Sequence, residues 1–342
     1  MRKALFIGGT GTISTAVVRR LAAQGDWKIW LLNRGHRRID FGDNVHSLTA
    51  DINDEAAAAK LLEGMEFDAV CEFVGFTRGQ VERDVRLFSG KTRQYIFTSS
   101  ASAYHKPAPS PFITEGTSLA NPYWQYSRDK IACEDYLMEQ YRKSGFPVTI
   151  VRPSHTYDEN HVTVAVHGAK GAWQVVKRMM EEKPVLIPGD GTSLWAVTFN
   201  ADFAVGYTGL MGNPHAIGEA FQITGDEILT WNQIYETIAD ALHVKLNPCH
   251  VSSDFLAEVG PQYDLAGALL GDKATSVIFD NSKLKKLVPE MRTNIPFDQG
   301  IRIVLDNVLA HPELQVEDPE FDEFCDRIVA AKRHAIEEVL RK

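Results

Sequence analysis

The 342-residue sequence predicts an α/β protein built on a doubly wound parallel sheet, with a smaller lobe towards the C-terminus. Up to about residue 150, short apolar runs alternate with segments of helical spacing. This alternation is typical of parallel strands joined by helices that cover both faces of the sheet. The first run, residues 4–7, is apolar throughout, as expected for a strand that is buried on both faces.

The elements follow in order from these patterns. The expected strands of the first part are residues 4–7, 28–32, 45–48, 69–73, 95–98 and 148–151, and its helices are residues 12–23, 55–62, 80–88 and 124–143. After Arg152-Pro153 we expect a strand at 195–199 and helices at 171–182, 201–210, 231–242, 297–309 and 320–340. We therefore expect a Rossmann-type domain over residues 1–152. A mainly substrate-binding lobe follows over residues 153–342, with some segments returning to the first domain.

Composition narrows the class of partner. Hydrophobic residues make up 44% and charged residues 24%, which is an ordinary globular balance. The net charge of −9 disfavours a nucleic-acid partner, which would require a basic face. The four cysteines form no closely spaced pair, so neither a metal site nor a disulfide framework is expected. No run reaches the ~18 apolar residues of a membrane span. We expect a cytoplasmic protein that acts on a small molecule.

A glycine-rich segment follows the first expected strand and opens the first helix. Gly8 permits a tight turn, and Gly11 lets the backbone approach a pyrophosphate lying over the amides at the helix N-terminus. The third position of the glycine spacing is Ser14, which is small enough for close helix–strand packing. The alternative is a turn with a purely structural role. The expected dinucleotide contacts of this segment are Gly8, Thr10, Gly11, Thr12 and Ile13.

The second expected strand ends in Asn33-Arg34. An NAD site usually has Asp or Glu there for the ribose 2′-hydroxyl. Without that carboxylate, an arginine can bind a 2′-phosphate in bidentate fashion, so the sequence favours NADP over NAD. Arg37 and Arg38, which follow, are also consistent with a solvated loop. Further cofactor contacts are expected at Asp51, placed to meet the adenine amino group, and at Ile52, Phe73 and Val74.

Tyr126 and Lys130 lie four residues apart on an expected helix, which puts both side chains on one face. An adjacent ammonium, helped by a cationic nicotinamide ring, would lower the pKa of the tyrosine and suit it to acid–base work at neutral pH. A serine hydroxyl would complete such a site, and the serine-rich end of the fifth strand, residues 98–104, supplies candidates. The Tyr-x-x-x-Lys spacing is common by chance, and its position after the other two motifs is what favours a catalytic role.

These residues together resemble the extended short-chain dehydrogenase/reductase family, which includes nucleotide-sugar epimerases and dehydratases. The resemblance covers most of the chain, including the segments 151–153 and 188–191 and Asp202. It implies that the tyrosine is the acid–base and that the lysine binds the nicotinamide ribose. It places the serine that orients the substrate oxygen at Ser100, with Ser99 as the alternative. Pro153 would lie beside the nicotinamide.

Three departures from the family pattern narrow the expected reaction. Ala101 and Ser102 stand where 4,6-dehydratases carry an Asp-Glu pair, which argues against dehydration. Trp195 stands where epimerases usually have an arginine for the nucleotide diphosphate, which puts such a substrate in doubt. His155 replaces a frequent Asn and is either a ligand of a substrate hydroxyl or an ordinary loop histidine. Cations that could replace the arginine, or could simply be solvated helix charges, are Lys170, Lys177 and Arg178.

Two functions remain open from the sequence. The first is an NAD(P)-dependent oxidoreductase or epimerase that acts on a secondary alcohol or ketone, such as a sugar, with substrate contacts at Ser100, Ser102, His155 and Trp195. The second is a dinucleotide-sensing or RNA-associated protein on the same fold. The retention of both Tyr126 and Lys130 favours the enzyme. We also expect a homodimer formed through the helices at 80–88 and 124–143.

Overall fold

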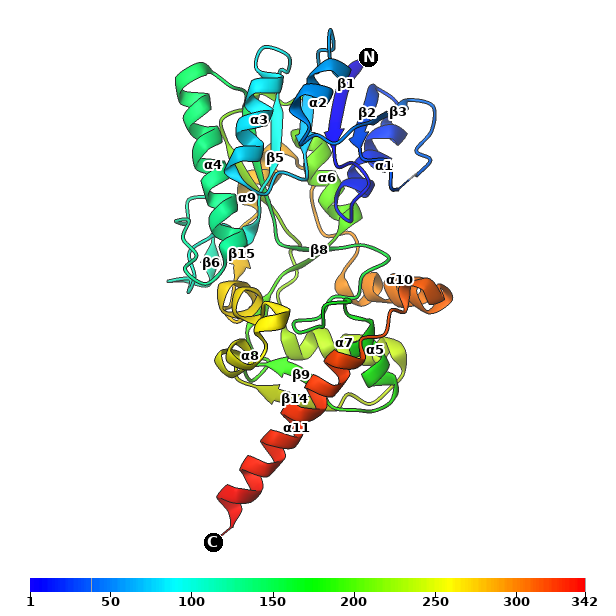
Figure 1. The fold of residues 1–342 in the computed structure, drawn as a ribbon, viewed down its shortest axis with the longest axis vertical. Coiled ribbons are helices and arrows are strands. Elements are labelled where there is room, and N and C mark those ends of the chain that lie inside the picture. The colour runs from blue at the N-terminus through cyan, green and yellow to red at the C-terminus, as the bar shows by residue number, and fades with distance from the viewer. Residues whose placement is uncertain (38, 342) are drawn as a thin grey trace.

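The computed structural model describes residues 1–37 and 39–341, and its centre is a seven-stranded parallel sheet in the order β12-β7-β5-β4-β1-β2-β3 (Figure 1). The strands are β1 (Arg2–Ile7), β2 (Trp27–Asn33), β3 (Val45–Thr49), β4 (Ala69–Glu72), β5 (Tyr95–Thr98), β7 (Val148–Pro153) and β12 (Ala220–Ile223). The expected fold class is therefore confirmed. Arg38, one of the arginines considered above, lies outside the described residues.

Helices cover both faces of this sheet. One face packs against α1 (Ser14–Gln24), α6 (Asn200–Leu210) and α9 (Ser282–Leu287). The other face packs against α2 (Glu55–Leu61), α3 (Arg78–Phe88) and α4 (Gln125–Ser144). Because both faces are covered, the central strands are buried along their length, which explains the continuous apolar runs of the sequence.

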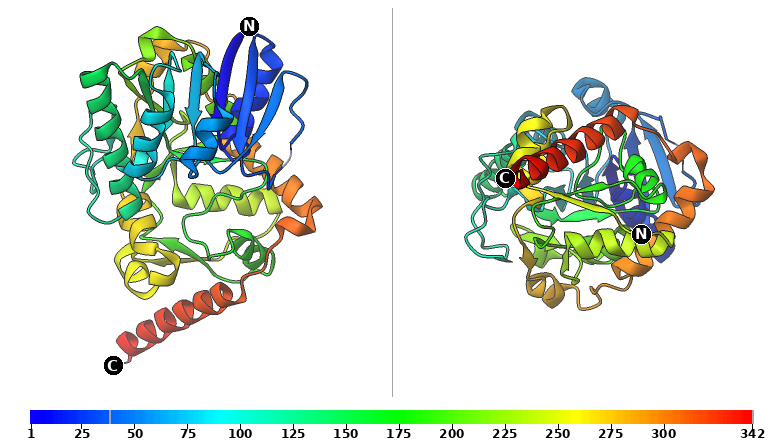
Figure 2. Two further views of the ribbon diagram at one scale, coloured as in Figure 1. Left: turned by 45° about the horizontal axis from the view of Figure 1, so that its top comes forward. Right: turned by 90° about the horizontal axis from the view of Figure 1, so that it is seen from below.

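The chain after Pro153 contributes to both bodies. Strand β12, which the sequence patterns did not indicate, pairs in parallel with β7 at the sheet edge, with Ala220 opposite Ile150. The lobe itself contains α5 (Trp173–Met180), α7 (Trp231–Leu242), α8 (Ser253–Val259), α10 (Phe297–Ala310), α11 (Pro319–Leu340) and a π-helical segment, Ala266–Lys273. The second half of α11 extends away from the body (Figure 2). Within the described residues, no helix has the length and apolarity that a membrane crossing requires.

Short strands complete the lobe and its junction with the sheet. The strand expected at 195–199 is wrong as a single element, because the chain changes partner at Ala196. The residues before and after Ala196 pair with different strands. Because both parts are buried, their apolar pattern does not indicate that the strand is interrupted. The pairs are β10 (Leu194–Trp195) with β13 (Leu229–Thr230), β11 (Val197–Phe199) with β8 (His155–Tyr157), β9 (Val185–Pro188) with β14 (Pro248–Val251), and β6 (Phe112–Ile113) with β15 (Ile278–Phe279).

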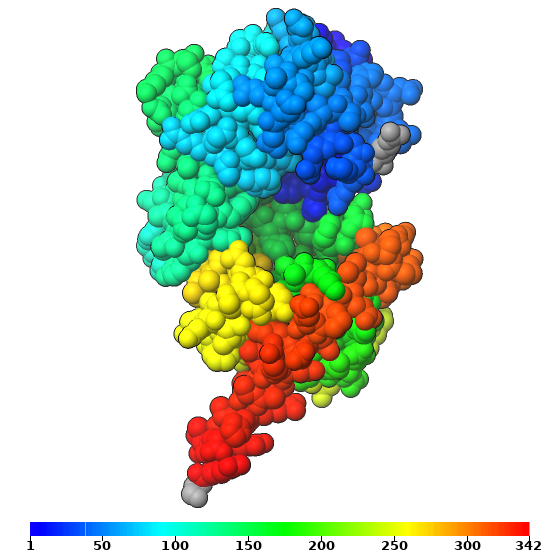
Figure 3. Space-filling model, viewed as in Figure 1, coloured from blue at the N-terminus to red at the C-terminus, as the bar shows by residue number. Residues whose placement is uncertain are grey.

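The carboxyl ends of the central strands face the lobe, and Figure 3 shows a hollow between the two bodies. In doubly wound sheets this edge is where ligands bind. The loops after β1, β4, β5 and β7 all line a cavity at this edge. The fold therefore brings residues from the glycine turn, the serine-rich strand end and the start of α4 to one place.

Candidate functional site

Two cavities of about 590 Å³ and about 500 Å³ lie at the carboxyl edge of the sheet. They share Gly8, Gly11, Val74 and Phe76 in their walls, so they form one continuous trough. The structure brings all the sequence-predicted site residues to this trough. The smaller cavity is lined by Thr10, Asn33, Arg34, Asp51 and Ile52, and the larger by Thr12, Ile13, Phe73, Ser100, Ser102, Tyr126, Lys130, Pro153, His155 and Trp195.

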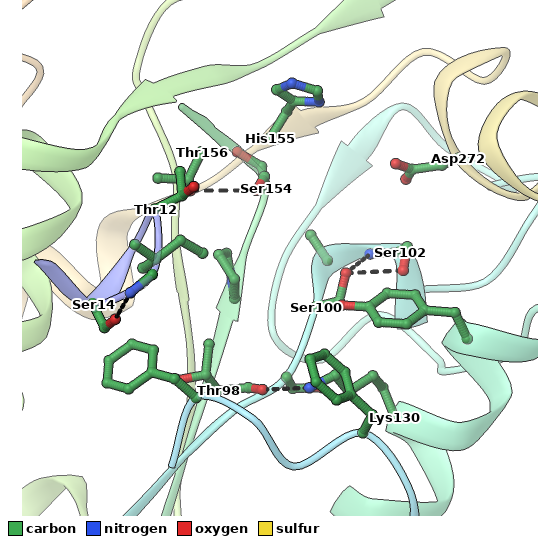
Figure 4. A pocket seen from close by; sticks show the side chains of 18 of the residues that line it. Thr12, Ser14, Thr98, Ser100, Ser102, Lys130, Ser154, His155, Thr156 and Asp272 are labelled. Carbon is green, nitrogen blue, oxygen red and sulfur yellow. Dashed lines mark hydrogen bonds between the residues drawn. The ribbon is translucent and has the colours of Figure 1, made fainter. Parts of the chain in front are cut away.

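The glycine turn forms the floor where the two cavities meet. Gly8 has φ +83°, and a Cβ there would lie 2.5 Å from Cγ1 of Val74. A Cβ on Gly11 would meet only the Ser14 hydroxyl, at 3.5 Å, so the backbone is open to the cavity. Ser14 Oγ donates to the Gly8 carbonyl (2.6 Å) and accepts from the Gly11 amide (2.9 Å) (Figure 4). Ser14 thus fastens the turn whose open amides fit a pyrophosphate at the N-terminus of α1.

The smaller cavity has the features of an adenosine site. Arg34 and Arg37 line it together with Asn33, and no described carboxylate pairs with Arg34. Asp51 Oδ1 accepts from the Asn53 main-chain amide (2.9 Å) and side-chain amide (3.0 Å). These two bonds fix the orientation of the Asp51 carboxylate in the wall of the cavity.

Lys130 lies in the second turn of α4 and is 1% exposed. Its ammonium donates to the carbonyls of Gly75 (2.7 Å) and Thr98 (2.8 Å). Burial lowers the pKa of Lys130 to about 8, because desolvation disfavours the charged form. The two carbonyls come from the loop after β4 and from the end of β5, so Lys130 ties α4 to the floor of the larger cavity.

The pKa of Tyr126 depends on its burial and on the side chains around it. Burial raises the pKa of its phenol, and the hydrogen bond with Ser100 opposes that rise. The Lys130 ammonium is held by its two carbonyls and lies 5.9 Å from the centre of the tyrosine ring, so it does not offset the desolvation. The lowering expected from Lys130 together with a cationic nicotinamide ring stays a prediction.

A chain of buried hydroxyls leads to Tyr126. Ser127 Oγ donates to Ser102 Oγ (2.7 Å), which lies 2.9 Å from Ser100 Oγ. The Ser102 amide also donates to Ser100 Oγ (3.2 Å). Either Ser100 or Ser102 can be the donor between them, and the Ser100 hydroxyl also forms a hydrogen bond with the Tyr126 phenol. Figure 4 shows the pair Ser100–Ser102 beside the cavity.

Ser99, the alternative to Ser100, has a different role. Its hydroxyl donates to Glu134, which forms a buried ion pair with Arg152 (2.6 Å). Arg152 also lies over the ring of Tyr104, 4.9 Å from its centre. The Ser99 hydroxyl is thus engaged with Glu134, and Ser100 is the serine whose hydroxyl forms a hydrogen bond with Tyr126.

The larger cavity ends against the lobe. Burial and nearby Lys273 lower the pKa of His155 to about 3, so its ring is neutral. Trp195 is 2% exposed and stacks on Trp231 with ring centres 5.7 Å apart. Asp272, in the π-helical segment, also lines this end. Sequence reasoning missed Asp272, because no motif precedes it and its segment follows no regular spacing.

The three cations considered as replacements for the missing arginine line neither cavity. Lys177 pairs with Glu317 (2.6 Å). Arg178 pairs with Asp322 (2.7 Å) and Asp326 (2.8 Å) of α11. Lys177 and Arg178 therefore hold α5 against the segment that contains α11. The expectation that either of them replaces the missing arginine at a nucleotide diphosphate is wrong.

Comparisons with known proteins show the family of the chain. Residues 4–224 match the model of the NAD dependent epimerase/dehydratase family. The chain is 23% identical over 287 residues to 2'-dehydrokanamycin reductase of Streptomyces kanamyceticus, covering 84% of this chain and 79% of that protein. It is 24% identical over 253 residues to the chloroplast stem-loop binding protein of 41 kDa b of Arabidopsis thaliana, covering 70% and 63%.

The fold also matches solved structures. UDP-glucuronic acid 4-epimerase from Bacillus cereus, solved with UDP-glucuronic acid and NAD, superposes with a TM-score of 0.71 at 17% identity, covering 90% of this chain and 99% of that one. At this identity the likeness supports the fold. The family match spans the glycine turn, the serine-rich strand end and the tyrosine–lysine helix, and it confirms the resemblance drawn from the sequence. The chain therefore belongs to the NAD dependent epimerase/dehydratase family and is an NAD-dependent enzyme.

Proposed function

We propose that the protein is an oxidoreductase or epimerase that acts on a secondary alcohol or ketone of a sugar-like substrate. The observation that carries this proposal is the meeting of Ser100, Tyr126 and Lys130 in the cavity that also contains the open amides of the glycine turn. The turn, Asp51 and Pro153 would hold the dinucleotide. When bound, its nicotinamide ring supplies or accepts a hydride.

The side chains of the larger cavity move the proton. Because burial raises its pKa, the Tyr126 phenol is protonated at neutral pH and can give its proton to a carbonyl oxygen as that oxygen gains negative charge. Ser100, held by the Ser102 amide, orients the same oxygen through its hydroxyl. Lys130 keeps the first turns of α4 against the cavity floor and stands ready to donate to a ribose hydroxyl. This arrangement favours ketone reduction.

Dehydration is not part of the proposal, because Ala101 and Ser102 offer no carboxylate beside Ser100. Net oxidoreduction and epimerisation differ in the fate of the dinucleotide. An epimerase returns the hydride to the same substrate and keeps its cofactor, whereas an oxidoreductase releases it. Dinucleotide that co-purifies with the protein would favour the epimerase.

The test is Tyr126→Phe, which removes the phenol hydrogen and keeps the ring. We expect turnover of a keto glycoside, identified by following the absorbance of the reduced nicotinamide, to fall by at least about a thousandfold. Binding of NADH should stay within about twofold of the unmodified protein, which shows that the site is intact. Turnover that survives this substitution would remove Tyr126 from the mechanism.

We further propose that the dinucleotide is NADP in preference to NAD. Asn33 puts no negative charge at the ribose 2′ position, and Arg34 and Arg37 line the adenosine cavity. An arginine can bind a 2′-phosphate through two parallel hydrogen bonds. This preference would distinguish the protein from those neighbours whose structures contain NAD.

The alternative role in RNA binding receives its support from the Arabidopsis relative, which is named for binding a stem-loop. The net charge of −9 and the retention of Tyr126 and Lys130 favour the enzyme. Retention of a stem-loop RNA in a gel-shift assay at physiological salt would support the alternative.

We also propose a homodimer formed through α3 and α4, and light scattering that finds only the 38.2 kDa monomer would exclude it.

A further inference from the structure

Asp272 presents a carboxylate to the larger cavity at the end that faces the lobe (Figure 4). Its side chain is 18% exposed, and no residue in the described part of the chain donates a hydrogen bond to its carboxylate oxygens. The nearest cation is the Lys106 ammonium, 3.9 Å away. That ammonium donates to the main-chain carbonyl of Asp272 (3.3 Å) and lies over the ring of Trp195. The carboxylate is thus only loosely paired.

The Asp272 carboxylate lacks hydrogen-bond donors from the protein that would stabilise its charge. Burial raises the pKa of Asp272, because desolvation penalises its charged form. A charge withdrawn from water needs hydrogen-bond donors as well as a nearby opposite charge. Lys273, the next residue, does not supply them, since its ammonium donates to the carbonyl of Ala165 (3.3 Å). The exposed part of the Asp272 side chain faces the cavity, where a ligand can supply the donors that the protein does not.

The surrounding wall limits what such a ligand can be. Among the described residues of the cavity wall, Asp272 and Lys130 are the charged side chains, and Lys130 is already bonded to two carbonyls. The His155 ring is neutral, and its nitrogens form no hydrogen bond with any described residue. Trp195, which stands where the family resemblance implies an arginine, also lines this cavity. The wall therefore suits hydroxyl or ammonium groups and provides no cation for a pyrophosphate.

We propose that this end of the cavity binds a polyhydroxylated glycoside or cyclitol that carries no phosphate, and that Asp272 accepts hydrogen bonds from its hydroxyl or ammonium groups. This inference deepens the proposed function and rests on it, because the same cavity contains Tyr126. Asp272 is then a specificity residue, since it binds a part of the substrate away from the reacting carbon. His155 is placed to exchange hydrogen bonds with neighbouring hydroxyls of the same ligand.

The test compares three probes by calorimetry on the full chain loaded with NADH. Kanamycin carries ammonium and hydroxyl groups, sucrose carries hydroxyl groups alone, and UDP-glucose carries a diphosphate. We expect kanamycin or sucrose to bind with a lower Kd than UDP-glucose. Whichever of these two compounds binds more tightly shows whether ammonium or hydroxyl groups donate to Asp272. Asp272→Asn and Asp272→Ser should each raise that Kd by at least about tenfold, the loss expected for a hydrogen bond to a charged group.

Asp306→Asn is the matched control, because Asp306 is exposed on α10, away from the cavity. It should leave all three Kd values within about twofold. The inference is overturned if UDP-glucose binds most tightly, if both Asp272 variants bind the glycoside like the unmodified protein, or if neither glycoside binds at about 10 mM, far above a ~1 mM Kd. These outcomes concern binding alone. Failure of the proposed function would instead appear as turnover that survives Tyr126→Phe.

Discussion

The dinucleotide end and the substrate end of the trough offer different groups to their ligands. At the dinucleotide end, the turn after β1 offers its main chain to the cavity, Ser14 holds that turn in place with two hydrogen bonds, and Arg34 and Asp51 line the adenosine part. At the substrate end, the cavity is lined by side chains such as His155, Trp195 and Asp272. Main-chain amides recognise a phosphate whatever is attached to it, whereas side chains set which substrate fits.

The difference predicts that the two ends tolerate substitution differently. A change in the glycine turn alters the backbone and should disturb every dinucleotide. A change such as Asp272→Asn alters one side chain and should leave dinucleotide binding intact.

Gly8→Ala should abolish tight dinucleotide binding. The new Cβ would lie 2.5 Å from Val74 in a residue with φ +83°, so the turn must move and its amides with it. We expect the Kd of NADH and NADPH to rise by about a hundredfold, measured by fluorescence titration. Gly25→Ala is the control: it has a similar φ of +75° but nothing within 4 Å of the new Cβ. Equal losses of affinity in both variants would show that backbone strain alone, and not the clash at Val74, is responsible.

The same contrast explains how much the sequence could reveal. The glycine turn and the pair Tyr126/Lys130 are each contiguous in the chain, so their spacing predicts a shared site, and the parallel sheet brings them together. Lys106, Trp195 and Asp272 come from distant segments, and their meeting depends on how the lobe packs. No local pattern encodes such a meeting.

The surroundings of Tyr126 could not be predicted from the sequence for a related reason. The spacing of Tyr126 and Lys130 puts both side chains on one helix face, but it does not show where the ammonium goes. Carbonyls of Gly75 and Thr98, from two other segments, hold it. The chain of Ser100, Ser102 and Ser127 also requires α4 to pack against the end of β5 before its members meet.

Arg34→Ala should separate the two dinucleotides. If Arg34 binds a 2′-phosphate, the Kd of NADPH should rise by about 10- to 100-fold, the loss of a charge-assisted pair, while the Kd of NADH changes by less than about threefold. Arg37→Ala is the matched control, because Arg37 lines the same cavity from the same loop. A larger effect from Arg37 would move the phosphate contact to that residue. Equal affinity of the unmodified protein for both dinucleotides would remove the preference for NADP altogether.

Ser127→Ala should produce the smallest effect, a shift in the pH profile with little change in maximal rate. Removing the Ser127 donor leaves Ser102 less polarised, so the hydrogen bond that Ser100 offers to the Tyr126 oxygen weakens. The phenolate loses support, and the pKa of Tyr126 should rise by about 0.5 to 1, equivalent to the net value of one hydrogen bond.

Alcohol oxidation needs the phenolate, so its rising limb should move to higher pH by that amount, whereas ketone reduction below the pKa should be unchanged. Ser99→Ala is the control, because the Ser99 hydroxyl bonds to Glu134 and not to the chain of hydroxyls that reaches Tyr126. Superimposable pH profiles for the unmodified protein and Ser127→Ala would show that the chain of hydroxyls only fixes the position of Ser100. A shift confined to Ser127→Ala would show that the substrate end adjusts its acid–base group through buried side chains, as the dinucleotide end adjusts its amides through Ser14.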